Sequence, residues 1–224
     1  MNTKMSIAAM VALTLLLALP ASVHAAEANT LEPLKIELPE ASNQGTPCEH
    51  WSPNLEPEEY KERPPLLVPQ GTALLSKGKP VAASAKEPVL GGWKQVTDGD
   101  KRFENNSLVE LDSGVQWVQV DLQEERAIQA VLIWHAHKEK RVYFDLVVQL
   151  ASDADFKTGV TTIYNNDYDN SSGLGVGKDK EYIENNRGRL MKVDGVKARF
   201  VRCYSNGNSA NPMNNYVEVE VFGK

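Results

Sequence analysis

The 224-residue sequence is poor in cysteine, with only Cys48 and Cys203. Two cysteines far apart do not provide the paired Cys or Cys/His spacing of a structural zinc site. They leave a Cys48–Cys203 disulfide open in an oxidising compartment. Alternatively, Cys203 packs as a small buried hydrophobe, because it alternates with Val201 in the segment ARFVRCY. The sequence does not decide between the two.

Long apolar runs are also scarce. The run Ile7–Leu19 is shorter than the roughly 20 residues that a membrane-spanning helix needs. Lys4 precedes it, Pro20 and small residues follow it, and a small-x-small cleavage signal ends at Ala25. This pattern predicts a secretory signal peptide over residues 1–25. We therefore expect an exported protein, periplasmic or extracellular, without a membrane span.

Positive charge is in the minority. Lys and Arg number 24 against 30 Asp and Glu, so the formal net charge is -6. A chain of this sign is repelled by nucleic acid and by anionic membrane surfaces. We expect no nucleic-acid partner, whereas bound cations would be tolerated.

Common catalytic motifs are absent, since the chain has neither G-x-S-x-G nor H-E-x-x-H. Acid pairs two residues apart, such as Asp98/Asp100 and Asp167/Asp169, carry no acid–base assignment without geometry. No segment outside the domain delimited below is long enough for a second, catalytic domain. We expect a protein that is not an enzyme.

Residues 26–70 are rich in proline and acid. Eight prolines, at positions 33, 39, 47, 53, 57, 64, 65 and 69, exclude a long helix or a central strand. Apolar residues such as Leu34, Ile36 and Trp51 are too frequent for a simple linker. The segment predicts an extended arm along the surface of the domain, and the alternative is a flexible spacer.

Residues 71–224 have the pattern of a β domain. Several segments are short, rich in β-branched and aromatic residues, and separated by Gly, Asn, Asp and Ser: 115–122, 127–136, 142–151, 160–164, 196–204 and 215–223. No segment shows a sustained helical period. These observations predict an all-β sandwich or jelly roll.

Three motifs occur in a defined order within this domain. They are QVTDGD (95–100), WVQVDLQEERAIQAVLIW (117–134), and VKARFVRCYSNGN followed by NYVEVEVFG (196–223). The ordered set resembles the discoidin family, also called coagulation factor V/VIII type C domains, and the related galactose-binding-like modules of bacterial carbohydrate-active proteins. The resemblance implies a galactose-binding-like jelly-roll β-sandwich.

The resemblance also implies a structural calcium ion. Carried over to this sequence, Asp98 of the acidic turn and Glu218 of the last strand become side-chain ligands, with further oxygens from Gln95, Asp100 and Val217. Calcium takes six to eight oxygen ligands of mixed carboxylate and carbonyl type. The segment KRFENNS, which follows the turn, departs from the usual Thr or Ser of the family. The alternative is that Asp98 caps a turn and Glu218 is an edge charge.

A sugar site on loops near the calcium is a further implication of the resemblance. Such a site combines an aromatic platform with polar groups that contact hydroxyls. The candidates are Trp93 as the platform, His135, His137, Lys138 and Arg141 in the segment WHAHKEKR, and Asn206, Asn208, Asn214 and Asn215 in the segment SNGNSANPMNN. The sugar-contacting residues of the family do not match one by one, so no sugar specificity is transferred. Alternatively, these loops carry only turn chemistry.

The segment NNDYDNSSGLGVGKDKEY (165–182) partly resembles an EF-hand calcium loop and a phosphate-binding P-loop, but it matches neither pattern. An EF-hand beginning at Asp167 would place Ser172 and Lys178 where Gly and Glu are required. A P-loop would require Ser or Thr where Asp179 follows Gly-Lys. We predict a long inter-strand loop that contributes to specificity.

Two classes of function remain open. The first is an exported, non-catalytic module that recognises carbohydrate or another cell-surface polymer through loops of a calcium-stabilised sandwich. The second is a structural or adhesion protein that holds a protein partner through the sandwich and residues 26–70.

Overall fold

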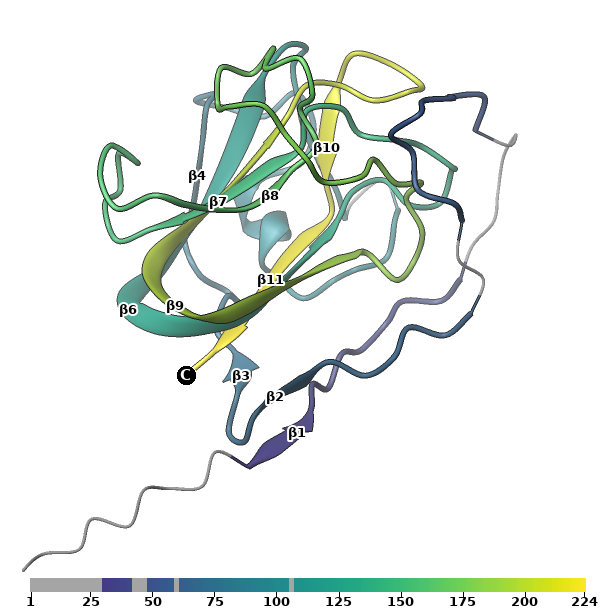
Figure 1. Ribbon diagram of the computed structural model, residues 1–224. Helices are drawn as coiled ribbons and strands as arrows, with labels where there is room; N and C mark the ends of the chain where they lie inside the picture. The colour runs from purple at the N-terminus through teal and green to yellow at the C-terminus, as the bar shows by residue number, and fades with distance from the viewer. Residues whose placement is uncertain (1–29, 42–47, 59–60, 105–106) are drawn as a thin grey trace, which may run out of the picture.

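The computed structural model describes residues 30–41, 48–58, 61–104 and 107–224 (Figure 1). The predicted signal peptide, residues 1–25, lies outside this range and stays a prediction. Within the described part of the chain, no helix has the length and apolar character needed to cross a membrane.

The described residues form eleven strands and one short 3-10 helix. In chain order these are β1 (Leu31–Pro33), β2 (Leu67–Pro69), β3 (Ala73–Leu74), β4 (Val81–Ala83), η1 (Trp93–Val96), β5 (Val109–Leu111), β6 (Gln116–Trp134), β7 (Val147–Ala151), β8 (Thr161–Asn165), β9 (Arg189–Ser205), β10 (Asn214–Tyr216) and β11 (Glu218–Gly223). All paired strands run antiparallel. The predicted all-β sandwich is therefore confirmed.

The two longest strands, β6 and β9, build both layers of the sandwich. The first part of β6 pairs with β4 and with the second part of β9, which continues to β7 and β8. The second part of β6 pairs with β11 and with the first part of β9. Both strands bend between these parts, so one continuous hydrogen-bonded sheet supplies two facing layers (Figure 1).

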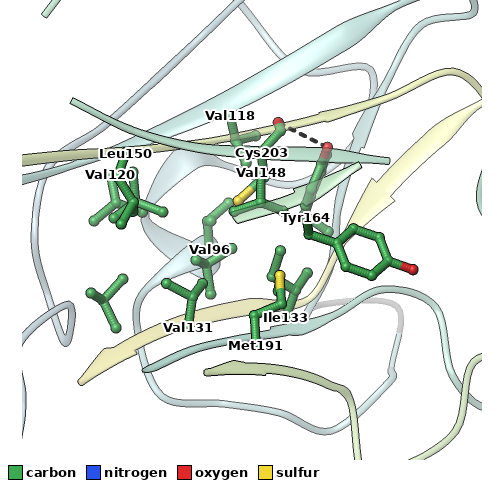
Figure 2. Packing of buried hydrophobic residues seen from close by; sticks show 14 of the residues in the cluster. Val96, Val118, Val120, Val131, Ile133, Val148, Leu150, Tyr164, Met191 and Cys203 are labelled. Atoms are coloured by element: carbon green, nitrogen blue, oxygen red, sulfur yellow. Dashed lines mark hydrogen bonds between the residues drawn. The ribbon is translucent and has the colours of Figure 1, made fainter. Parts of the chain in front are cut away.

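The hydrophobic core lies between these layers. Val118 and Val120 of β6 face inward from one layer, and Val131 and Ile133 of the same strand face them from the other (Figure 2). Val96 of η1 lies between the two sets and is fully buried. Valine and isoleucine suit this position because their branched side chains pack well on a pleated surface.

The predicted strand boundaries need one correction. Residues 115–122 and 127–136 were predicted as two strands, but residues 116–134 form the single strand β6, and residues 135 and 136 lie beyond its end. The strand pairing is irregular between Asp121 and Arg126, and Gln123 has a positive φ of 71°. The polar segment between them therefore bends the strand rather than ending it.

The proline-rich segment forms a long hairpin-like excursion beside the sandwich. β1 and β2 pair at its base, and Leu34 N donates to Leu66 O at 2.8 Å. In Figure 1 the outgoing and returning parts of this arm lie along one side of the sandwich. Leu34 and Leu66 pack on the smaller apolar cluster around Trp134. The arm thus shares apolar surface with the domain.

The two cysteines are free. Cys203 is fully buried in the core, as its alternation with Val201 predicted, and burial raises the pKa of its thiol. Cys48 lies on the arm, where its Sγ is 3.6 Å from Ser209 Oγ. The disulfide that the sequence left open is not formed in this structure.

Candidate functional site

An open cleft of about 740 Å³ lies between the arm and the sandwich. The arm contributes residues 41, 56–58 and 61–63, and the sandwich contributes 137, 138, 140 and 182–189. We call this feature the arm cleft. Its volume lies within the range of about 300 to 1,000 Å³ that is typical of small-molecule sites.

Hydrogen bonds between arm and sandwich hold the walls of the arm cleft. Glu56 N donates to Glu181 O at 2.9 Å, and Arg63 Nη2 donates to Gly188 O at 2.6 Å. Both acceptors belong to the chain segment that forms the opposite wall, so direct contacts hold the arm to that wall at two points. The arm is therefore part of the site.

Gly188 explains why the chain turns sharply at the sandwich wall. Its φ is +58°, and a Cβ atom there would lie 2.7 Å from Ile133 O and 2.9 Å from the Trp134 ring. Only glycine fits this close approach without displacing backbone. The turn is also fixed by Trp134 Nε1, which donates to Asn186 O at 2.9 Å.

The lining of the arm cleft is strongly polar. It contains six basic residues, Lys61, Arg63, Lys138, Lys140, Arg187 and Arg189, and four acidic residues, Glu56, Glu58, Glu62 and Glu184. Two of the acids are paired within the lining: Glu56 with Arg189 at 2.7 Å, and Glu58 with Lys140 at 2.9 Å. Asparagines 185 and 186 add further donors and acceptors.

Glu184 of the cleft lining is half of a buried pair. His135 Nδ1 and Glu184 Oε1 are 2.5 Å apart, and both side chains are fully buried. The His135 ring stacks on Tyr143 with ring centroids 4.3 Å apart. Ligand contact by His135 was predicted from the sequence, and the structure contradicts it because the side chain has no exposed surface.

The other residues of WHAHKEKR have different positions. His137 lines the arm cleft, although it is largely buried and its Nε2 is 2.8 Å from Lys101 O. Lys138 lines the cleft as well. Arg141, the last residue of this segment, is not part of the cleft lining and pairs with Glu139, with Nε 3.1 Å from Oε2. The segment thus contributes to a cleft, through residues other than His135.

The predicted asparagines are not part of the arm cleft. Asn214 is fully buried, accepts from Gly207 N and donates to Asp112 O, so it supports the loop instead of offering a ligand contact. Asn208 is nearly buried, and Asn206 donates to Asp145 Oδ2 at 2.8 Å. For Asn214 the predicted ligand contact is wrong, because burial removes it from the surface.

Trp93, the predicted aromatic platform, lies in η1 and is partly buried against the main core. Its Nε1 is 3.4 Å from Lys86 O. The exposed tryptophan of the described residues is Trp51, on the arm, with 81% of its surface accessible. Sequence reasoning assigned Trp51 to the arm without a role, since nothing local shows which apolar side chains of an extended segment point outward.

The predicted calcium residues come together in part. Gly99 N of the acidic turn donates to Glu218 Oε2 at 3.0 Å, so the turn and the last strand are in contact. Asp98 is close enough to act electrostatically on Glu218, but Asp98 Oδ1 also accepts from Asp100 N at 2.7 Å. The Asp100 carboxylate forms a two-pronged pair with Arg102.

Glu218 itself has features that fit a cation. It is fully buried, and its Oε1 has no hydrogen-bond partner among the described residues. Burial raises the pKa of Glu218 to about 9, and the nearby carboxylates Glu220 and Asp98 add to this rise. A divalent cation would compensate both the unpartnered oxygen and the repulsion. The backbone of Gln95 and of Val217, from which carbonyl ligands were predicted, borders this region in η1 and before β11.

The loop 165–182 is tied down internally. Asp167 is fully buried and accepts hydrogen bonds from Ser171 N and Ser172 N. A Cβ at Gly177 would lie 2.5 Å from Asn165 O, which explains the glycine. Asp145, Asp167 and Asp169 bring carboxylate oxygens within 4.8 Å of one another. These contacts hold the loop against the domain, whereas its predicted role in specificity stays a prediction.

Comparison with known proteins gives matches among solved structures only. No family model matches the sequence, and no curated protein matches it. The solved structures that the chain resembles include carbohydrate-binding modules of family 32.

Three of these structures illustrate the level of similarity. The CBM32 of AlyQ, in complex with 4,5-unsaturated mannuronic acid, is 22% identical with a TM-score of 0.46 over 64% of this chain and 93% of that chain. The family 32 CBM from C. perfringens NanJ, in complex with galactose, is 12% identical with a TM-score of 0.48 over 67% and 98%. A family 89 glycoside hydrolase from Clostridium perfringens is 22% identical with a TM-score of 0.49 over 67% of this chain, but this covers only 14% of the hydrolase. Similarity at this level concerns the fold and does not transfer a ligand.

Proposed function

We propose that this chain is an exported, non-catalytic binding module that recognises carbohydrate in the arm cleft. The observation that carries the proposal is the cleft itself, about 740 Å³ in volume and lined by Arg, Lys, Asn and Glu side chains from two walls. A carbohydrate presents many hydroxyl groups, and each accepts and donates hydrogen bonds. Side chains with several donors or acceptors in fixed directions suit such a ligand.

A glycan microarray in the presence of calcium tests this proposal. The wild type is expected to bind a defined set of glycans. Replacing the exposed cleft residue Asn185 by tryptophan should block the cleft and abolish those signals. Lys157→Trp, at an exposed site outside the cleft, is the matched control and should bind as the wild type does. Equal binding by both variants would place the ligand elsewhere.

A structural calcium ion at the acidic turn is part of the proposal. Asp98 and Glu218 would supply carboxylate oxygens, and the backbone near Gln95, Asp100 and Val217 would supply carbonyl oxygens. The unpartnered, buried Glu218 Oε1 supports this assignment. The ion would link the turn to the last strand and stabilise the sandwich, while the ligand binds in the arm cleft.

A second candidate function is attachment of a protein partner through the arm. Trp51 favours it, because a tryptophan with 81% exposure is the kind of apolar anchor that protein interfaces bury. If this function is the true one, Trp51→Ala removes a co-purifying protein without changing any glycan signal. If carbohydrate binding is the true function, Asn185→Trp removes the glycan signals.

A further inference from the structure

We infer that the arm cleft selects acidic oligosaccharides, with a carboxylate or sulfate group of the glycan bound beside Arg63 and Lys138. This inference rests on the proposed function and specifies its class of ligand. It follows from the balance of charge in the cleft and from the position of two cations there.

The first step concerns the charges that are already compensated. Arg189 is paired with Glu56 and packs against the rings of Tyr164 and Tyr182, with its guanidinium 5.1 and 4.8 Å from their centroids. Lys140 is paired with Glu58. These contacts commit two cations of the sandwich wall to holding carboxylates of the arm, so Arg189 and Lys140 offer little to a ligand.

The second step concerns Arg63, Lys138 and Lys61, for which the described residues provide no ion pair. Arg63 donates to the neutral carbonyl of Gly188, and no ion pair of Lys138 or Lys61 is recorded among the described residues. Among the described acidic residues of the lining, Glu62 alone forms no ion pair, and its side chain is exposed. Among the described lining residues, basic side chains therefore outnumber acidic ones, in a chain whose net charge is -6.

The surroundings of Arg63 support this view. Burial and then the positive charges of Arg187 and Arg189 lower the pKa of Arg63, and the negative charge of Glu56 opposes this only in part. Like charges held this close are relieved by an anion placed among them. A guanidinium binds a carboxylate or sulfate through two parallel hydrogen bonds, whereas an ammonium such as that of Lys138 acts as a point charge. Their combination recognises an anionic group and gives little preference to a neutral sugar.

Isothermal titration with two kinds of acidic hexasaccharide tests the inference. The probes are uronic-acid hexamers of α and β linkage and sulfated hexamers, each compared with the uncharged hexamer of the same linkage. We expect at least one acidic hexamer to bind about tenfold or more tightly than its uncharged counterpart, which is the effect of one charge-assisted hydrogen bond. Which acidic probe is preferred distinguishes carboxylate from sulfate.

Variants assign this preference to the cleft. Lys138→Gln should reduce the affinity for the acidic hexamer about tenfold and leave the uncharged hexamer unchanged. Lys157→Gln removes the same charge at an exposed site outside the cleft and should have no effect. Arg63→Gln should act like Lys138→Gln, but it also removes the contact with Gly188, so Lys138→Gln is the decisive variant.

The outcomes separate this inference from the proposed function. If acidic and uncharged hexamers bind equally, or if Lys138→Gln and Lys157→Gln behave alike, the inference is wrong while carbohydrate binding stands. If no hexamer and no arrayed glycan binds, the inference and the proposed function both fall.

Discussion

Glu218 links stability to pH in a way that the structure quantifies. In the absence of divalent cations the folded-state pKa is about 9, whereas the ordinary value is 4.5. Between these values the folded protein holds a proton that the unfolded chain has released. Stability from this group is therefore full below pH 4.5 and is lost as the pH rises toward 9.

The size of the effect follows from the interval. Each pH unit in this window costs up to about 1.4 kcal/mol. From 4.5 to neutral pH the loss amounts to about 3 kcal/mol in the free energy of unfolding. Glu218→Gln keeps the shape of the neutral acid and cannot ionise. In EDTA, this variant should therefore be about as stable as the wild type at pH 5 and more stable by a few kcal/mol near pH 8.

Urea unfolding, followed by tryptophan fluorescence at several pH values, measures this difference. Other groups contribute to the pH dependence of the wild type, but they cancel when the variant is subtracted. Calcium should reverse the order near pH 8, because it stabilises the ionised carboxylate of the wild type and has no such ligand in Glu218→Gln. A wild-type-minus-variant difference that does not change with pH in EDTA would refute the account of Glu218. A wild type that gains no stability from calcium would refute the metal site.

Three further predictions concern the packing. Ile133→Ala, in the fully buried core, should lower the free energy of unfolding by about 2 to 5 kcal/mol in urea, and a loss below 1 kcal/mol would contradict the packing of β6. Gly188→Ala places a Cβ 2.7 Å from Ile133 O, so it should lower the melting temperature and weaken glycan binding. The control Gly78→Ala places a Cβ that meets no atom within 4 Å and should leave glycan binding unchanged. Equal effects of the two variants on binding would argue against the close approach at Gly188. Cys203 should resist alkylation in the folded protein and react after unfolding, because burial raises the pKa of its thiol; rapid labelling under native conditions would be inconsistent with the core position.

Much of the fold could be predicted from local sequence pattern. Val118 and Val120 alternate with polar residues, and period-two alternation has a direct structural meaning in a strand. The continuity of β6 could not be predicted in the same way. Its polar segment around Gln123 has the composition of a turn, and the pairing of β6 with β9 resumes at Arg126 after the irregularity that follows Asp121.

The site was less predictable, because it is assembled from distant parts of the chain. Arg63 and Gly188 are 125 residues apart, and nothing near either of them indicates the contact. His135 illustrates the opposite error. Its polar type suggested a surface role, but its Nδ1 is hydrogen-bonded to Glu184 and its ring stacks on Tyr143 inside the domain. Burial of a polar residue depends on partners that local sequence does not show.

The central claim is that the arm cleft is the ligand site. Chemical-shift changes in ¹H–¹⁵N spectra, recorded as the tightest-binding acidic hexasaccharide is added, test it most directly. The account predicts that the largest changes fall on residues 61–63, 137–140 and 182–189, with smaller changes elsewhere. Largest changes at Trp93 and in residues 205–214, with the arm cleft unaffected, would contradict it.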